Sequence, residues 1–377
     1  MATATKPERN RPDGASGHDM PDELHPRHLA VRVAQISALI AVVAIGVGAL
    51  PGLGDIRARL TDADPVWVVA VALAEVGSCA GYLLAFRSTF CRQMPWGLSY
   101  DIAMAEQAAN SLLPSGGAGG LALGVWALHR AGMPTAHIAR RTVAFFVLTS
   151  APNFVGVVLV GLAMFVGLLP GNAPVELTLG AAVIAGLVIL GAWLSPRLLR
   201  RFGEPLARAD AQALSGRLGR RLRGGLEAAA DGVDLFKELM RGGSFGALVG
   251  SFAYLALDIA ALGFAFAAVG PVPAFGALVL GYLIGQLGNL IPLPGGVGGT
   301  EGALVGVFAL YHVNVPLAAA AVLIYRLFQL TVPALLGAPA FVMLRRRLMR
   351  EDQPAALCAP LGAEAAELPV VHLPSRG

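Results

Sequence analysis

The sequence predicts an all-α integral membrane protein with about six spanning helices plus two re-entrant or broken helical hairpins in a pseudo-inverted repeat. Hydrophobic residues make up 56% of the 377-residue chain and charged residues only 14%, whereas a soluble domain carries about 25% charged residues. Several apolar segments reach the length of about 20 residues that a helix needs to cross a bilayer. Two further apolar segments are interrupted by nearly the same phrase of glycine and proline.

The uninterrupted apolar segments predict the spanning helices directly, because each is long enough to cross the hydrocarbon core. They are residues 33–53, 65–86, 141–169, 175–195, 245–269 and 317–343. The interrupted segments have arms that are mostly too short for a full crossing, and each predicts a hairpin of two half-helices. These hairpins are residues 98–130 and 273–311.

This pattern predicts one polytopic membrane domain, residues 31–350, between two polar tails. The tails, 1–30 and 351–377, are rich in polar residues and proline, a composition typical of disorder. Within the membrane domain the predicted order is repeat one at about 65–195, a basic cytoplasmic loop at 196–241 and repeat two at about 245–345.

The interrupting phrase runs from Gln107 to Gly120 in the first repeat and from Gln286 to Gly299 in the second. The glutamine, an asparagine and four glycines recur at the same spacing. Proline removes a backbone donor and glycine is unfavourable in a helix interior, so both phrases break a helix. In a bilayer such a break survives only where protein or a wet cavity satisfies its polar groups. Paired breaks in two halves therefore indicate a transporter's binding site.

Basic residues predict the orientation of the chain. The arginine-rich loop at 196–241 and the triplet at 345–347 are expected on the cytoplasmic side. Counting spans from these segments places both termini in the cytoplasm of a multi-pass plasma-membrane protein. The first hairpin then opens from the cytoplasm and the second from outside, an inversion typical of alternating-access transporters.

The latter part of the basic loop has two interpretations. Leu226, Val233, Leu235, Phe236 and Leu239 suggest an amphipathic helix whose basic face lies along an anionic membrane surface. Alternatively, the loop is a plain linker whose positive charge only sets the topology.

The second repeat contains the clearest candidates for a binding site. Arg326 lies inside an apolar run and needs a partner or a wet cavity, and Glu301 is the nearest acidic residue in sequence. Arg326 is suited to holding an anionic headgroup such as a phosphate, or the two residues form a structural pair that fixes the hairpin to the last helix. The predicted substrate-binding residues are Glu301, Arg326, Tyr325, Asn289, Gly298, Gly299, Asn110, Gly119 and Gly120.

The glycines themselves are open to two interpretations. The phrases lack the Lys-Ser/Thr pair of a phosphate-binding P-loop and follow no strand. Free backbone donors at the start of a half-helix favour an anion site at residues 119–121 and 298–301. The glycines can equally serve tight packing of the hairpin arms.

Three further acidic residues lie within apolar segments. Glu106 and Asp258 are candidates for proton coupling, because burial disfavours the charged carboxylate, or they are structural acids with satisfied partners; Glu75 has no assigned role. His129 and His312 lie at the predicted hairpin ends, where a proton-relay role is the weaker interpretation.

The sequence contains no recognisable catalytic set, so no enzymatic activity is expected. There is no Ser-His-Asp arrangement, no HExxH motif and no soluble region large enough for a catalytic fold. Neither a cofactor nor a metal is predicted, since the three cysteines, Cys79, Cys91 and Cys358, have no metal-binding or CxxC spacing. Nucleic acid is not an expected partner, because no basic stretch has a recognised motif.

The phrase from Asn289 to Glu301, followed by Tyr325-Arg326, resembles the transmembrane domain of lysylphosphatidylglycerol synthases and their stand-alone flippase-like relatives. The resemblance covers about residues 33–345 and implies a bundle with re-entrant hairpins that moves or binds lipids across a bacterial plasma membrane. The aminoacyl-transfer domain of the full-length synthases has no room here, so lysyl transfer is not expected. The family's first repeat often carries a Gly-Glu pair and a basic residue where residues 118–123 carry no charge.

Three functions remain open at this point. The first is a flippase-like protein that binds or translocates an anionic or polyprenyl-linked lipid. The second is a non-transporting membrane partner of a glycosyltransferase or lipid-modifying enzyme, docked through residues 196–241. The third is an ion-coupled transporter of a small soluble anion. Membrane lipids are thus the expected partners.

Overall fold

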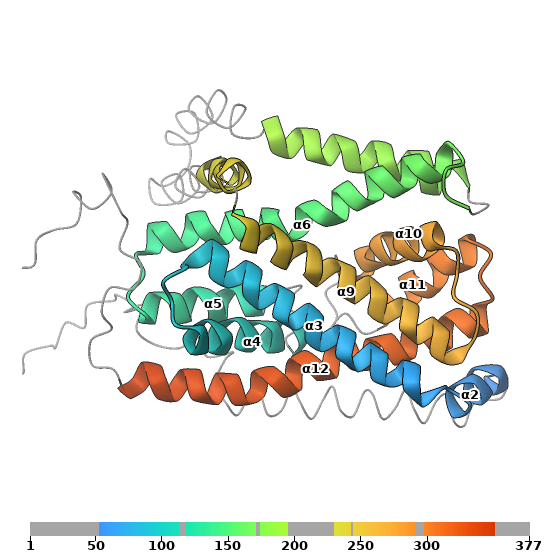
Figure 1. Cartoon of the computed structure of the whole chain (residues 1–377), viewed down its shortest axis with the longest axis horizontal. Helices are drawn as coiled ribbons and strands as arrows, with labels where there is room; N and C mark the ends of the chain where they lie inside the picture. The colour runs from blue at the N-terminus through green and yellow to red at the C-terminus, as the bar shows by residue number, and fades with distance from the viewer. Residues whose placement is uncertain are drawn as a thin grey trace, which may run out of the picture.

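The computed structural model describes residues 53–112, 118–170, 174–194, 230–242, 244–290 and 298–350. Within these ranges the regular structure is helical and contains no strand. The helices lie alongside one another, most of them close to the long axis of the molecule (Figure 1). This arrangement confirms the predicted all-α fold.

The helices follow the predicted segments closely. A short helix, α2 (Gly54–Thr61), precedes the first repeat. The first repeat contains α3 (Pro65–Phe90), α4 (Trp96–Leu112), α5 (Ala118–Arg130), α6 (Thr135–Phe165) and η2 (Glu176–Gly180), a π-helical turn that opens the apolar helix Glu176–Leu194. A helix at 230–241 precedes the second repeat. The second repeat contains α9 (Phe245–Val269), α10 (Phe275–Gly285), η3 (Gln286–Leu290), α11 (Gly299–Leu310) and α12 (Val315–Arg350).

Five of the described helices are long and apolar enough to cross a membrane. They confirm five of the six predicted spans; the sixth, 33–53, lies almost wholly outside the described residues. Large apolar side chains such as Phe146, Leu73 and Phe245 are exposed to 70%, 67% and 76%. Such exposure suits a surface that faces lipid rather than water.

Helices α3 and α9 form the closest-packed pair at the centre of the bundle (Figure 1). Their backbones approach at two glycines, one on each helix. A Cβ atom added to Gly81 would lie 2.6 Å from the backbone nitrogen of Tyr254, and one added to Gly250 would lie 2.5 Å from that of Ala85. Small residues at a membrane helix crossing permit this approach.

The two hairpins pack against opposite ends of the long helix α12. Near its C-terminus, Arg347 Nε lies 3.2 Å from Asp101 Oδ2 at the start of α4, and Gly337 lies against Met104 one turn further along α4. In the N-terminal half of α12, Arg326 contacts Glu301 in the first turn of α11. The described arms of the two hairpins therefore contact opposite halves of α12.

Each hairpin consists of two packed arms, as the interrupted segments predict. The first pairs α4 with α5, and the second pairs α10 with α11. The first arm of the second hairpin changes to a 3-10 helix at Gln286, before the break. The breaks themselves, residues 113–117 and 291–297, lie outside the described part of the chain.

Arginines gather where α3, α5 and α12 end and where α6 begins. Arg141 donates from Nη1 to the carbonyl oxygens of Thr89 and Phe90, the latter at 2.5 Å, and Arg92 donates to Ser244 Oγ at 2.7 Å. The predicted topology likewise places these residues on a common side of the membrane. Whether that side faces the cytoplasm stays a prediction.

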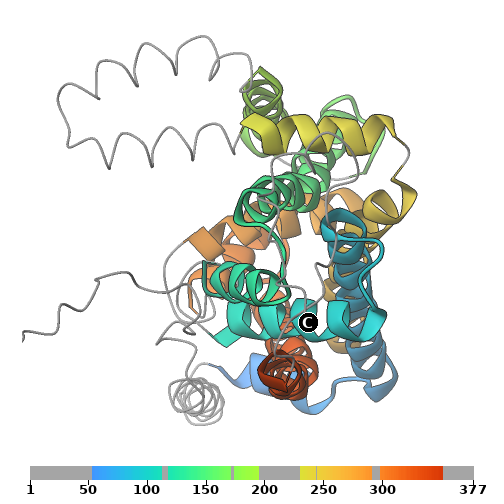
Figure 2. The ribbon, with the colours of Figure 1, turned by 90° about the vertical axis from the view of Figure 1, so that its left-hand side faces the viewer.

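The predicted tails and most of the basic loop lie outside the described residues. From this loop the structure describes the helix at 230–241, which lies across the bundle beside α6 (Figure 2). Val233 is 8% exposed, Gly232 packs against Val143 of α6, and Arg140 pairs with Glu238 at 3.5 Å. The apolar face of this helix is thus directed at protein in the described part.

Candidate functional site

A buried ion pair joins the second hairpin to α12. Arg326 Nε donates to Glu301 Oε1 at 2.8 Å, and the two side chains are 6% and 19% exposed. Arg326 is eleven residues after Val315, which begins α12, so the pair lies about 16 Å along the helix axis at 1.5 Å per residue. The pair therefore fixes the first turn of α11 to the N-terminal half of α12.

Glu301 also occupies the N-terminus of α11. Its Oε2 accepts a hydrogen bond of 2.6 Å from the backbone N–H of Gly298. Gly298 has a φ of 90°, a left-handed conformation that glycine adopts without strain. The anion position predicted at residues 298–301 is therefore filled by a carboxylate of the protein itself, which receives both a helix-terminal donor and a guanidinium.

Gln329 connects this ion pair to a second buried acid. It lies one helical turn after Arg326, which donates from Nη1 to Gln329 Oε1. Gln329 Nε2 in turn lies 3.3 Å from Asp258 Oδ2. An arginine has no acceptor, so the amide oxygen of Gln329 must face it and the amide nitrogen must face Asp258.

Asp258, in the middle of α9, is the centre of this network and is 5% exposed. Tyr325 donates from its hydroxyl to Asp258 Oδ1 at 3.0 Å, and the hydroxyl of Tyr282 donates to Oδ2. Gln286 Nε2 then donates to the Tyr325 hydroxyl at 3.0 Å. Donors from α10 and α12 thus meet at one carboxyl group of α9, and Gln286 of η3 reaches it through the Tyr325 hydroxyl. Each donor lowers the cost of burying the carboxyl group.

Glu75 brings α3 into the same network. Its carboxyl group is within hydrogen-bonding reach of Asp258 and is 3% exposed. Its other oxygen, Oε1, is buried without a hydrogen-bond partner among the described groups. We refer to Glu75, Asp258, Tyr282, Gln286, Glu301, Tyr325, Arg326 and Gln329 together as the polar network.

The first hairpin contains a separate polar contact at its break. Asn110 Oδ1 accepts a hydrogen bond of 3.0 Å from the backbone N–H of Gly120, which closes the two arms. A Cβ atom on Gly120 would lie 2.2 Å from that oxygen and 2.5 Å from the carbonyl oxygen of Glu106. This close approach supports the packing interpretation for Gly120.

Glu106 is buried beside the hydroxyl of Tyr82 on α3, its side-chain hydrogen-bond partner. The neighbouring Gln107 reaches Tyr254 on α9, one turn before Asp258. Glu106 and Asp258 are therefore separate acidic sites beside the same α3–α9 contact.

The structure brings together some of the predicted site residues and not others. Glu301, Arg326, Tyr325 and Asp258 belong to the polar network. Gly298 donates its backbone N–H to Glu301 of this network, and Gly299 begins α11. Asn110, Gly120 and Glu106 lie at the first hairpin, together with the buried Gly119. The side chain of Asn289 lies outside the described residues.

Sequence reasoning missed Tyr282 and Gln329 and gave no role to Glu75. The spacing of residues in the sequence could have identified Gln329 and Tyr282. Gln329 follows Arg326 by three residues and hence shares its helix face, and Tyr282 precedes the repeated Gln286 by four.

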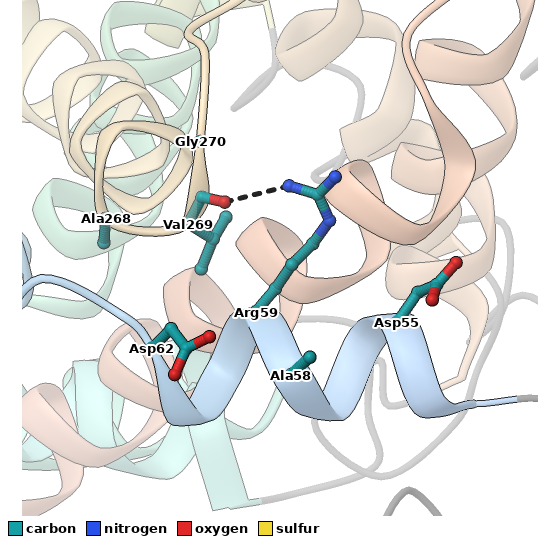
Figure 3. A pocket seen from close by; sticks show the side chains of 7 residues that line it. All are labelled: Asp55, Ala58, Arg59, Asp62, Ala268, Val269 and Gly270. Carbon is teal, nitrogen blue, oxygen red and sulfur yellow. Dashed lines mark hydrogen bonds between the residues drawn. The ribbon is translucent and has the colours of Figure 1, made fainter.

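A cleft of about 620 Å³ lies at the far end of the bundle, between α2 and the end of α9 (Figure 3). Arg59 crosses it and donates from Nη1 to the Val269 carbonyl oxygen at 3.1 Å, with Asp55 and Asp62 beside it on α2. None of the predicted site residues lines this cleft. Among the described residues, no group of three or more His, Cys, Asp or Glu is placed to hold a metal.

Comparisons with known proteins place the chain in a membrane-domain family. No curated protein sequence matches this chain. The profile of the lysylphosphatidylglycerol synthase TM region matches residues 35–337, the bulk of the chain. That range contains the five described spans almost entirely, both hairpins and every member of the polar network. The protein is therefore a multi-pass membrane protein that belongs to the lysylphosphatidylglycerol synthase transmembrane region family.

Proposed function

We propose that this protein is a flippase-like membrane protein that binds or translocates an anionic or polyprenyl-linked lipid. The observation that carries the proposal is the convergence of Arg326 and the Gly298 N–H on one carboxylate, that of Glu301, at the N-terminus of α11. A phosphate headgroup offers the same negative oxygens to the same two donors.

Glu301 acts in this proposal as a displaceable occupant of the headgroup site. Its side chain is the more exposed of the pair, at 19% against 6% for Arg326. A phosphate that approaches from that side takes the place of the carboxylate on the guanidinium. The guanidinium fork suits a phosphate because it can bind two of the oxygens at once.

The two hairpins supply the element that would move. Their described arms pack against opposite halves of α12 (Figure 1). Inverted broken helices around a midplane site are characteristic of alternating-access transporters. Rocking of one hairpin against the other would expose the Arg326 site to each leaflet in turn.

Family membership supports a lipid rather than a small soluble anion as the cargo, because the matched region is the membrane part of a lipid-modifying enzyme. The helices also present large apolar side chains outward. The matched region excludes the aminoacyl-transfer part of those enzymes, which supports a non-enzymatic role. We place the protein in the plasma membrane with its arginine-rich end cytoplasmic, in accordance with the positive-inside rule.

Lipid flip in proteoliposomes tests the proposal. Wild-type protein, Arg326→Ala and Arg346→Ala are reconstituted with fluorescent phospholipids or labelled polyprenyl phosphates. Arg346 is an exposed arginine on the same helix and serves as the matched control. We expect flip by the wild type and by Arg346→Ala and its loss in Arg326→Ala. If the wild type moves none of these lipids, or if Arg326→Ala moves them equally well, the proposal is wrong.

The second candidate is a membrane partner of a glycosyltransferase or lipid-modifying enzyme. The helix at 230–241 favours it, since α6 holds one face of this helix while Asp231, Glu238 and Met240 are exposed on others. Affinity capture with residues 196–241 deleted separates the candidates. Loss of a bound enzyme with lipid flip intact favours docking as a distinct role.

A further inference from the structure

We infer that Glu75 and Asp258 form a proton-binding site in which Glu75 carries an exchangeable proton, and that its occupancy controls the Arg326–Glu301 pair. The two acids face each other where α3 packs against α9, at exposures of 3% and 5%. The ligand of this site is the hydrogen ion. The control of Arg326 rests on the proposed function, whereas the proton site itself does not.

Hydrogen-bond directions identify Asp258 as the ionised member. Its Oδ1 faces the Tyr325 hydroxyl, and its Oδ2 faces the Tyr282 hydroxyl and Gln329 Nε2. Arg326 fixes the orientation of the Gln329 amide, which leaves that nitrogen as a donor to Asp258. A carboxyl group that receives three donors is satisfied as a carboxylate.

The contact with Glu75 then requires a proton on Glu75. Two ionised carboxyl groups within hydrogen-bonding reach repel each other, so one of them holds a proton. Asp258 already accepts on both oxygens, and Glu75 is left as the donor. Its second oxygen, Oε1, is buried without a described hydrogen-bond partner, which a neutral carboxyl group tolerates far better than a carboxylate.

The groups around the two acids determine how the site responds to loss of the proton. The titratable or charged groups that face them come from α3, α9, α10 and α12, and they are Cys79, Tyr254, Tyr282, Tyr325 and Arg326. Arg326 is the cation of this set. Its guanidinium therefore lies between two acidic sites, Glu301 on one side and the Glu75–Asp258 pair on the other.

Proton release adds one negative charge to the Glu75–Asp258 pair. The O–H bond of Glu75 breaks, the electron pair stays on the carboxylate, and the proton passes to water. The new charge attracts Arg326 toward Gln329 and Asp258 and weakens its hold on Glu301 or on a headgroup in its place. Proton binding reverses this shift, so proton and headgroup occupancy are coupled.

Infrared difference spectroscopy on the purified full chain tests the proton site without reference to lipid. A protonated buried carboxyl group has a C=O stretching band that a carboxylate lacks. We expect Glu75→Gln to remove one such component, while the matched control Glu238→Gln, at an acid that is 65% exposed in its side chain, leaves the band of protonated carboxyl groups unchanged. If Glu75→Gln removes no component, Glu75 holds no proton and the inference is wrong.

Melting temperatures identify which acid is protonated. Glu75→Gln retains a neutral group that can donate to Asp258, so we expect wild-type thermal stability. Asp258→Asn replaces the acceptor of three donors and is expected to melt well below the wild type. The opposite order, a stable Asp258→Asn and an unstable Glu75→Gln, would assign the proton to Asp258 and overturn the inference.

Lipid flip under a pH gradient tests the coupling. For one coupled proton, a gradient of one pH unit shifts the steady-state lipid distribution up to about tenfold. We expect this shift in the wild type and its loss in Glu75→Gln. If the lipid distribution that the wild type produces does not depend on the pH gradient, the coupling is contradicted. Absence of any flip, with the Glu75 infrared component present, overturns the proposed function and leaves the proton site supported.

Discussion

Arg326 Nε lies 2.8 Å from Glu301 Oε1 and fastens the first turn of α11 to the middle of α12. Both side chains are largely buried, and the same guanidinium continues through Gln329 to Asp258. A charge pair in this position holds the second hairpin and, in the proposed function, receives a headgroup. The sequence leaves two roles open for this pair, a headgroup site and a structural contact that fixes the hairpin to α12. In the proposed function one contact has both roles.

Removal of both partners of this pair should destabilise the protein by less than the sum of the two single removals. Arg326→Ala or Glu301→Ala leaves a buried charge unpaired, and such a loss typically costs about 3–5 kcal/mol. We expect the Arg326→Ala/Glu301→Ala double variant to be less destabilised than the sum of the single variants. Unfolding free energies of all four proteins in detergent measure this coupling, and strict additivity would show that the contact does not hold the hairpin.

The hydroxyls that face Asp258 should contribute measurably to stability. Tyr282→Phe and Tyr325→Phe each remove a hydrogen bond to a charged group, worth about 1.5–3 kcal/mol. Tyr325→Phe should cost more, because it also removes the acceptor of Gln286.

The matched control for these variants is Tyr311→Phe, whose hydroxyl donates to the Leu177 carbonyl oxygen at 3.2 Å outside the network. A smaller loss of about 1 kcal/mol is expected there. Equal losses in all three variants, measured from denaturant midpoints, would argue against Asp258 as a charged centre.

Gly120→Ala should open the first hairpin. The added methyl group would lie 2.2 Å from Asn110 Oδ1 and 2.5 Å from a backbone carbonyl oxygen of α4, so the two arms must separate. Overpacking of this kind costs about 1–3 kcal/mol, and protease cleavage between α4 and α5 should accelerate.

Gly302→Ala in α11 is the control for this variant, because a Cβ atom there meets nothing within 4 Å. That change should be neutral or stabilising by up to about 1 kcal/mol, since alanine favours helix. Comparable destabilisation by both variants would attribute the effect to helix propensity rather than to packing.

The α3–α9 contact should respond in the same way to Gly250→Ala, whose Cβ would lie 2.5 Å from the Ala85 backbone nitrogen. Displacement of α9 would carry Asp258 away from Glu75 and lower both the melting temperature and the infrared component assigned to Glu75. Gly186→Ala, with no atom within 4 Å of the added carbon, provides the comparison. A wild-type melting curve for Gly250→Ala would mean that the helices tolerate a wider separation.

The fold could be predicted from the sequence largely because few kinds of backbone structure can cross a bilayer. A segment such as 245–269 is apolar throughout and must be a helix that satisfies its own backbone, and the structure places α9 over the same residues. The hairpins could be predicted for the same reason, since proline and glycine mark where the helix stops. The ion pair of Glu301 and Arg326 could be predicted because two isolated charges in apolar surroundings need each other.

The rest of the site was beyond sequence reasoning. Asp258 meets Tyr325 across 67 positions of the chain and Gln329 across 71. Hydropathy places a residue at a depth in the membrane but does not determine how each helix is rotated about its axis. That rotation decides which polar side chain of α3, α9, α10 or α12 faces which.

The sequence by itself determined an all-α membrane bundle, the positions of its breaks and the need for Arg326 to find a partner. Only the tertiary structure decided that Glu301 fills the N-terminus of α11, that Asp258 accepts hydrogen bonds from α10 and α12 and that Glu75 faces it. The physical reason is that burial of a polar group is costly unless it is paired. The apolar composition of a segment shows which of its polar residues will be costly to bury. Which partners these residues find depends on how the helices pack.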